Sequence, residues 1–430
     1  MQKLYTSFFL MFVSPVLTLY AAFQSTNRTY KRYVLILFIT VFGSVFSFTG
    51  EGADEIADGV RHLENVETHY SNISFVQFMD EMRDIIFLQE NPNIKEDPYI
   101  HILSYVTGGI LQLPGLFFVF VSFVYGYFFA GSMFRLFAIF PKINYSKLFF
   151  GFAIIFISLK NLEGINTVRT WTGLWVLFYA CISYYQTGEN KYLWLMFVPP
   201  LIHIGYGLMA LPAWLVAFLG NRKSIYSILF AVSFATTLLN PGAAIDPLST
   251  TEVGAGKVRA YQLEEQQTTD DTLQEYASNR FYVQYGRVGV QTWAIMFIAF
   301  ILIGTGTYKT KMNMLESSLF SIGLLTKVLA NSFWFLYAVA NRADLVATVF
   351  ILASLLLLWQ RYFYTGEKPP FSGFQQALLS LALIALLPFL LLKTAQMIRF
   401  TSIFIFAFPF IPWFSEDFQI SIREFLGYFL

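Results

Sequence analysis

The sequence predicts an all-α polytopic integral membrane protein, because it is strongly apolar, contains a series of long apolar segments and distributes its charges unevenly between loops. Of its 430 residues, 56% are hydrophobic, only 13% are charged, and phenylalanine occurs 49 times. Such a composition is typical of a chain that crosses a lipid bilayer several times. The net charge of +1 gives no sign of nucleic-acid binding. We expect one membrane domain over residues 1–430.

The apolar segments number about twelve or thirteen, where a straight transmembrane helix needs about 20 residues. They fall near residues 4–23, 33–49, 115–138, 148–163, 170–186, 192–204, 206–220, 225–239, 288–308, 314–333, 343–360, 374–392 and 398–413. The first lacks a charged start and a cleavage site, so we expect a retained helix rather than a signal peptide. Residues 192–220 contain "VPPLIHIGYG" and fit two short helices, a re-entrant hairpin or one broken helix.

Short basic loops predict the orientation of these helices. The basic residues are Arg28, Lys31 and Arg32, then Arg135, Lys142 and Lys147, then Arg222 and Lys223, then Lys309 and Lys311, then Arg361 and Lys368. The positive-inside rule makes such loops cytoplasmic. All of them fall on one side if residues 99–112 form a partly embedded surface helix and residues 192–220 cross twice. The N-terminus is then outside.

Two long polar segments, residues 50–98 and 240–287, are then expected to be extracytoplasmic loops. The first carries twelve acidic and three basic residues, and the second carries seven acidic and four basic residues. Loops of this length in a compact bundle are usually functional or disordered. Apolar residues recur at helical spacing over residues 73–86, so we expect external helices in the first loop.

Ionisable residues in or beside apolar segments are candidates for a functional site, because each one must find a partner or water. Arg169 and Arg342 begin two spans and His203 ends another, all at the predicted external side. The alternatives are that the arginines reach lipid headgroups and that His203 is a hydrogen-bonded core residue. Lys327 lies deep in an apolar segment, where an ion pair with a neighbouring helix is the plain explanation. The single cysteine, Cys181, excludes an intrachain disulfide and is expected to pack in the core.

Four stretches of the first 220 residues resemble one protein family in their order and spacing. They are "FTGEGADEIADGV", "EDPYIHILSYVTG…FVYGYFFAGSMFRLF", "LEGINTVRTWTGLWVLFY" and "KYLWLMFVPPLIHIGYGLMALPAWL". The chain resembles the EpsG-type, Wzy-like family of bacterial exopolysaccharide and O-antigen repeat-unit polymerases, and "NRADLVATVFILAS" is similar to the family's late arginine segment. The resemblance implies a GT-C-like glycosyltransferase of the bacterial inner membrane that works at the external face.

The resemblance also implies partners and a chemistry. The substrate would be an undecaprenyl-diphosphate-linked oligosaccharide, a chain-length regulator protein would be a further partner, and no cofactor or metal is expected. Extending a glycan on a lipid diphosphate requires cations for the departing diphosphate and a group that takes a proton from the attacking hydroxyl. A planar guanidinium suits the first task.

Candidate residues follow for each task. We assign Arg169 and Arg342 to the diphosphate, with Arg280 and Arg287 as helpers from the second long loop. For Arg280 and Arg287 the alternative is contact with lipid headgroups. No acidic residue nearby in sequence shares a helix face with Arg169, since Glu163 lies six positions earlier, so we expect Arg169 to hold phosphate rather than a structural carboxylate.

Asp54 is the candidate base, with Asp58 one helical turn later, and the alternative is a solvated acidic loop. His203 is a candidate for a hydrogen bond to sugar or phosphate. Three aromatic residues near it are candidates for packing against sugar or isoprenoid, or else belong to an interfacial belt. They are Trp171, Tyr206 and Trp214.

Other classes of membrane protein remain open. A flippase or transporter of the lipid-linked oligosaccharide would need an aqueous cationic path, but it should show inverted repeats or charges spread through both leaflets. A ligase that transfers finished glycan has nearly the same requirements as a polymerase. An acyltransferase would place a histidine and an acid at the cytoplasmic face, whereas His203 is predicted at the external one.

Overall fold

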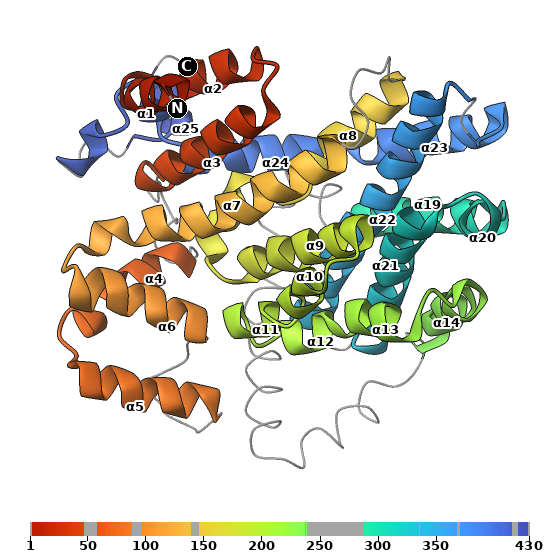
Figure 1. The fold of residues 1–430 in the computed structure, drawn as a ribbon, viewed down its shortest axis with the longest axis horizontal. Helices are drawn as coiled ribbons and strands as arrows, with labels where there is room; N and C mark the ends of the chain where they lie inside the picture. The colour runs from red at the N-terminus through yellow and green to blue at the C-terminus, as the bar shows by residue number, and fades with distance from the viewer. Residues whose placement is uncertain are drawn as a thin grey trace.

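The computed structural model of this protein consists of helices throughout the part of the chain that it describes (Figure 1). It describes residues 2–46, 58–87, 97–138, 146–236, 238, 288–334, 336–367, 370–414 and 420–428. Within these ranges, β-structure is limited to two isolated bridges, Phe46 with Thr401 and Ser402 with Ser421. The predicted all-α fold is confirmed.

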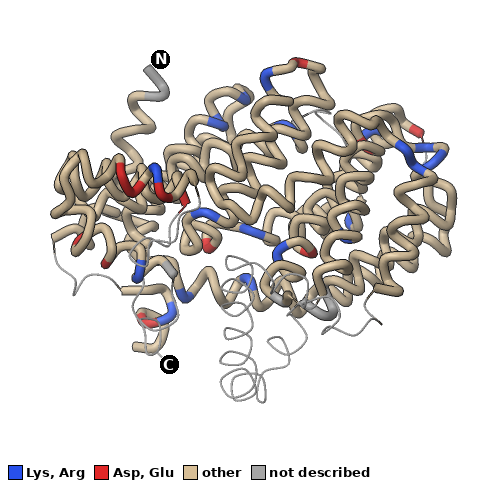
Figure 2. Tube along the Cα trace, turned by 90° about the horizontal axis from the view of Figure 1, so that it is seen from below, with Lys and Arg blue, Asp and Glu red and all other residues tan. Residues whose placement is uncertain are grey.

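Four helical stretches are long and apolar enough to cross a membrane, as expected for a membrane protein. They are Pro114–Phe137, Lys147–Thr167, Ala338–Thr365 and Gly373–Phe400. Three shorter apolar helices follow the same composition, at Tyr206–Leu219, Lys223–Thr236 and Thr292–Gly304. Charged residues occupy few positions along the described helices (Figure 2). The described chain therefore has fewer helices of full spanning length than the sequence has apolar segments. The reason is that several of these segments are divided into shorter helices.

The first apolar segment, residues 4–23, forms two helices. The N-terminal helices are α1 (Gln2–Val13), α2 (Pro15–Phe23) and α3 (Arg28–Ser44). Proline at the start of α2 has no backbone N–H to continue α1. Ser14 leaves helical geometry at φ −154°, and its side chain accepts a hydrogen bond from the backbone N–H of Leu17. The expectation of one continuous helix here is wrong.

Helices in the first polar segment are confirmed within the described residues. They are α4 (Asp58–Asn65), the π-helical turn η1 (Val66–Tyr70) and α5 (Phe75–Ile86). The next elements, α6 (Pro98–Ser104) and the π-helical turn η2 (Tyr105–Ile110), cover the region 99–112 in which a surface helix is expected. Tyr70, Phe78 and Tyr105 form a small core of their own, in which the rings of Phe78 and Tyr105 stack at 4.2 Å. Figure 1 shows α4, α5 and α6 grouped beside the main bundle.

Three consecutive helices lead on from the first polar segment, and the last of them is buried. They are α7 (Phe117–Ala138), α8 (Lys147–Leu159) and, after the 3-10 turn η4 (Leu162–Thr167), α9 (Thr170–Thr187). α9 is buried from Thr170 to Ser183, with Cys181 in its core, as expected for a helix that is apolar on all sides. The indole of Trp175 donates a hydrogen bond to the Tyr125 hydroxyl at 2.9 Å. That hydroxyl donates to the carbonyl of Asn161 at 2.6 Å, so α7 fixes the turn that leads into α9.

The segment 192–220 is broken into short helices. They are α10 (Asn190–Leu195), α11 (Pro199–Ile202), α12 (Tyr206–Met209) and α13 (Leu211–Leu219), followed by α14 (Lys223–Thr236). Proline residues begin α11 and occur in the first turn of α13, where they cannot donate to a preceding turn. The two complete passes assumed for this segment are not found, and the broken arrangement leaves His203 in extended backbone between α11 and α12.

Seven helices belong to the described C-terminal part of the chain. They are α19 (Val288–Gly304), α20 (Thr307–Thr310), α21 (Met314–Ser332), α22 (Tyr337–Thr365), α23 (Gly373–Ala385), α24 (Leu387–Phe400) and α25 (Ile422–Gly427). The last of them, α25, lies beside α1 and α2 (Figure 1). Residues 398–413 are not the separate helix expected from their hydropathy. α24 ends at Phe400, and Pro409 and Pro412 leave only short 3-10 turns beyond it.

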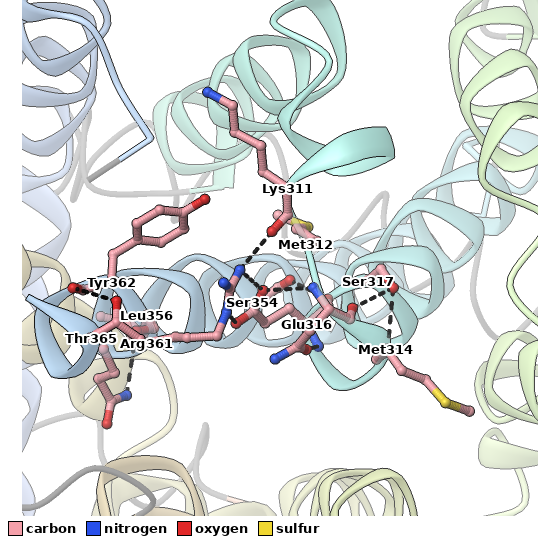
Figure 3. A network of polar contacts seen from close by, with 12 residues as sticks. Lys311, Met312, Met314, Glu316, Ser317, Ser354, Leu356, Arg361, Tyr362 and Thr365 are labelled. Carbon is pink, nitrogen blue, oxygen red and sulfur yellow. Dashed lines mark hydrogen bonds and ion pairs between the residues drawn. The ribbon is translucent and has the colours of Figure 1, made fainter. Parts of the chain in front are cut away.

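Two ion pairs join α21 to α22. Lys327 Nζ lies 2.6 Å from Asp344 Oδ1, which confirms the plain explanation for that buried lysine. At the other end, the Arg361 guanidinium binds both carboxylate oxygens of Glu316, at 2.6 and 2.9 Å, and also donates to the carbonyl of Lys311 (Figure 3). Since Glu316 is only 1% exposed, this pairing keeps a buried charge satisfied.

Candidate functional site

Asp97 is the centre of a buried polar cluster that joins three distant segments. Its Oδ2 atom accepts a hydrogen bond from Arg169 Nη1 at 2.6 Å and lies 2.9 Å from His203 Nδ1. Its Oδ1 atom accepts from the backbone N–H of Ile204, also at 2.9 Å. Asp97 occupies the N-cap position of α6 but makes no capping hydrogen bond. Its carboxylate instead binds residues from two other segments of the chain.

Arg169 is held by an unusual turn. Val168, which precedes it, has φ +53° and ψ −60°, and the backbone N–H of Arg169 donates to the carbonyl of Thr167 two residues earlier, as in a γ-turn. A β-branched residue at positive φ is strained, and such strain is often found at functional sites. The turn directs Arg169 toward Asp97 at the start of α9.

The expectation that Arg169 has no structural carboxylate is therefore wrong. Its partner is 72 positions away in sequence, at Asp97, and helix periodicity says nothing about such a pair. The side chain of Arg169 remains 28% exposed, whereas that of Asp97 is 6% exposed. Part of the guanidinium thus faces away from the carboxylate that holds it.

The electrostatic balance keeps Asp97 ionised. Burial by itself would raise the pKa of the Asp97 carboxyl, but the hydrogen bond from His203, the positive charge of Arg169 and the backbone amide of Ile204 together hold this pKa below its ordinary value. An ionised carboxylate can only accept hydrogen bonds. The Nδ1 atom of His203 must then carry the proton that lies between them.

His203 itself favours the neutral form. Burial lowers the pKa of His203, Asp97 raises it, and the positive charges of Arg169 and Arg342 lower it further, so that it lies below its usual value. With the proton on Nδ1, the lone pair of a neutral imidazole is on Nε2. Nε2 makes no hydrogen bond with the part of the chain that the structure describes. This atom can accept a proton.

Gly205 provides room beside the imidazole. A Cβ atom at this position would lie 3.3 Å from His203 Nε2, which is a tight contact. The backbone here turns from the extended His203 into α12, and the absence of a side chain leaves the Nε2 side of the ring less crowded.

Arg342 is the second cation of the cluster. It lies in the second turn of α22, and its positive charge contributes to lowering the pKa of His203. Among the described residues, no carboxylate forms an ion pair with Arg342. Asp344, two positions away, is instead paired with Lys327.

The remaining predicted residues are placed as follows. The backbone N–H of Gly59 donates to Asn166 Oδ1 at 3.1 Å, so the start of α4, where Asp58 is the first residue, packs against η4 near Arg169. Three predicted residues lie outside the described residues: Asp54, Arg280 and Arg287. The segment 240–287 lies there too.

The aromatic residues near His203 are packed within the protein. Tyr206 is fully buried and donates its hydroxyl hydrogen bond to the carbonyl of Thr170 at 2.8 Å. The indole of Trp214 donates to the carbonyl of Met196. Trp171 is 8% exposed and lies under Lys160, whose Nζ is 4.0 Å from a ring centroid of Trp171. These contacts position the backbone around Arg169 and His203.

Glu163, the acid nearest in sequence to Arg169, has its own partners. It pairs with Lys393 of α24, and Lys160 Nζ lies 3.7 Å from the same carboxylate oxygen. Lys393 also donates to Gln396 at 2.7 Å. This pairing ties the turn before α9 to α24 and leaves Asp97 as the carboxylate available to Arg169.

The cluster can bind an anion and accept a proton. A neutral imidazole oriented by a carboxylate is a general base, and a nearby arginine without a described carboxylate can hold phosphate oxygens in a bidentate manner. Sequence reasoning missed Asp97, because the acid before the proline in "EDPYIH" reads as an ordinary helix start and nothing in the sequence distinguishes it from the other acids of its segment. Comparison of the chain with protein-family models, curated proteins and solved structures finds no match.

Proposed function

We propose that this protein is a membrane glycosyltransferase that polymerises polyprenyl-diphosphate-linked oligosaccharide repeat units at the extracytoplasmic face of the bacterial inner membrane, on a GT-C-like scaffold. The observation that carries the proposal is the buried pair of His203 and Asp97, in which Nδ1 lies 2.9 Å from Oδ2, with Arg169 bound to the same carboxylate oxygen. The resemblance of "INTVRTWT" to the polymerase family supports the same reaction class.

In the proposed reaction, His203 is the general base. Nε2 takes the proton from a sugar hydroxyl of the acceptor as that oxygen forms a bond to the anomeric carbon of the donor. The bond between this carbon and the diphosphate breaks, and the polyprenyl diphosphate leaves with its electron pair. Asp97 is a positioning residue, because it holds the imidazole in one tautomer and stabilises the imidazolium that forms.

The cations would stabilise the leaving group. Negative charge grows on the diphosphate oxygens as the bond breaks, and preorganised positive groups in a water-poor site lower the energy of that state. Arg342 is the first choice because no described carboxylate competes for it. The exposed part of Arg169 can bind beside it. This assignment replaces Asp54 by His203 as the base, while Asp58 remains a candidate contact to the acceptor from the first loop.

Reconstitution tests the proposal. Purified full-length protein in liposomes is supplied with an undecaprenyl-diphosphate-linked repeat unit, and the products are separated by size. A polymerase gives a ladder of regularly spaced products, and Arg342→Ala should reduce the ladder by about 100- to 1,000-fold. Movement of the lipid across the bilayer without elongation would instead identify a transporter, and a single transfer to another acceptor would identify a ligase. Either result would refute the proposed polymerisation.

A further inference from the structure

A second group of cations lies at the opposite end of α7 and α9 from Asp97. The two helices run in the same direction, since Phe129 contacts Trp175 near their middles and Arg135 bonds Gln186 near their C-terminal ends. Arg135 is in the last turn of α7. Arg32, near the start of α3, reaches the same place.

The two arginines pack against a group of three tyrosine rings, Tyr127, Tyr179 and Tyr192. The guanidinium carbon of Arg32 lies 5.1 Å from the ring centroid of Tyr127 and 6.0 Å from that of Tyr179. The guanidinium carbon of Arg135 lies 5.2 Å from Tyr179 and 5.0 Å from Tyr192. Both cations therefore contact one ring, Tyr179. Cation–π contacts hold the flat guanidinium groups in place without neutralising them.

All the described partners of these two cations are neutral. Arg135 donates to Gln186 Oε1 at 3.2 Å and to the Tyr192 hydroxyl at 2.8 Å. The Nε atom of Arg32 is buried and has no hydrogen-bond partner among the residues that the structure describes. Within the described ranges, no carboxylate forms an ion pair with either arginine. Glu189 is close enough to sense the charge of Arg135, but it is exposed and already paired with Lys191 at 2.5 Å.

A glycine on α7 leaves space for the side chains of Tyr179 and Arg32. A Cβ atom at Gly131 of α7 would lie 2.7 Å from Tyr179 and 3.2 Å from a terminal nitrogen of Arg32. Glycine thus allows both side chains to lie directly against α7. At the outer edge of the group, Tyr127 is 40% exposed, so the group opens to the surface of the bundle.

Two like charges with only neutral neighbours call for an anion between them. We propose that Arg32 and Arg135 bind the phosphate group of an anionic phospholipid headgroup. The three tyrosine rings hold the two guanidinium groups in place for this contact. Guanidinium groups bind phosphate oxygens in a planar, bidentate manner, and basic pockets between transmembrane helices on the cytoplasmic side bind anionic headgroups. The positive-inside rule places Arg32 and Arg135 on that side. The chemistry recognised is a pair of anionic phosphate oxygens, which the phosphodiester of the lipid and free inorganic phosphate both offer.

Lipid titration tests this site independently of any enzymatic activity. Full-length protein in a neutral detergent is titrated with dioleoyl phosphatidylglycerol, with dioleoyl phosphatidylcholine as the reference, and bound lipid is counted by native mass spectrometry. We expect one phosphatidylglycerol to bind more tightly than phosphatidylcholine. Each arginine removed should weaken its binding by about fivefold, so Arg32→Gln combined with Arg135→Gln should weaken it by about 25-fold.

The matched control is Arg222→Gln. Arg222 is also predicted on the cytoplasmic side, but its side chain donates to the nearby carbonyl of Leu219 and contacts neither Arg32 nor Arg135 among the described residues, so its replacement should leave lipid binding unchanged. Arg32→Lys combined with Arg135→Lys keeps both charges, loses the planar fork and should give intermediate binding. If the double glutamine variant does not fold, Arg32→Gln alone carries the test.

Two competition experiments distinguish binding of the phosphate group alone from binding of the whole lipid. Displacement of phosphatidylglycerol by inorganic phosphate, but not by sodium chloride of equal ionic strength, would support a site that reads the phosphate group alone. Retention of the lipid under both salts would support recognition of the whole headgroup with its chains. Wild-type binding by the double glutamine variant, or equal affinity for phosphatidylcholine, would overturn the proposal.

Discussion

Asp97 and His203 are separated by 106 positions in sequence, yet a carboxylate oxygen of the first lies 2.9 Å from Nδ1 of the second. Asp97 is at the start of α6, and His203 is in the break between α11 and α12. The pair is buried, and Arg169 completes it from the start of α9. Three segments that the sequence presents as unrelated therefore meet at one carboxylate, and four predictions follow from this and a second ion pair.

Replacement of His203 tests its role as the general base. His203→Ala should lower the rate of polymer formation by about 100- to 10,000-fold, since a positioned base contributes about that much. The measurement is product formed per amount of correctly inserted protein. Gly207→Ala is a suitable control, because a Cβ atom there meets nothing within 4 Å. Wild-type turnover in His203→Ala would exclude the histidine as the base.

The pH profile of the reaction should move in opposite directions in two variants. Asp97 raises the pKa of His203 and Arg342 lowers it. Since the base acts only when neutral, activity should fall as the pH falls through this pKa. Asp97→Asn should therefore move the acid limb to lower pH, whereas Arg342→Gln should move it to higher pH.

Residual rates of both variants, measured between pH 4 and pH 9 (about the range over which histidine titrates), provide the data for this comparison. A purely structural role for Asp97 and Arg342 would change the height of the profile and leave its acid limb in place. Shifts of the same sign in both variants would contradict the electrostatic assignment.

A double-mutant cycle measures the coupling between Asp97 and Arg169. Asp97→Asn, Arg169→Gln and the double variant should give a coupling of about 1–3 kcal/mol in the free energy of unfolding in detergent, because each single change leaves a partly buried group without its partner. The exposed pair Glu189 and Lys191, also in contact at 2.5 Å, is the matched control. Water and salt screen this exposed pair, so its cycle should give much weaker coupling, and equal coupling in both cycles would refute a buried, structure-defining pair.

The ion pair between Glu316 and Arg361 predicts a stability effect at the other end of the bundle. Arg361→Met should lower the free energy of unfolding by about 3–5 kcal/mol, because it leaves the carboxylate of Glu316 buried and unpaired. Adding Glu316→Gln to this variant removes the charge and should restore part of the loss. Thermal unfolding in detergent checks both values, and a double variant less stable than Arg361→Met would contradict this account.

Much of the helical architecture was predictable, because hydropathy acts locally. The segments around α7, α9 and α22 were identified as apolar runs, and they form long, buried helices. Hydropathy failed where proline interrupts an apolar run. Pro15 divides the first segment, and Pro409 with Pro412 prevents a helix at residues 398–413. An apolar run specifies burial in lipid or protein, whereas continuity of a helix also requires an unbroken series of backbone N–H groups.

The site was predictable only in its cations and its histidine. Arg169, His203 and Arg342 stand out in sequence because charge in an apolar segment is costly and must be explained. Asp97 does not stand out, since it is one of twelve acids in a polar segment. For the same reason Asp54 and Asp58 looked equally suitable as a base.

The sequence by itself determined that this chain is a helical membrane protein and which unusual polar residues require partners, because composition and periodicity are local properties. Only the tertiary structure decided which partner each one has. Asp97 is paired with Arg169 and His203, Glu163 with Lys393, and Arg32 with no described carboxylate. The physical reason is that an ion pair depends on a few ångströms between side chains, and helix packing brings together residues that no sequence spacing relates.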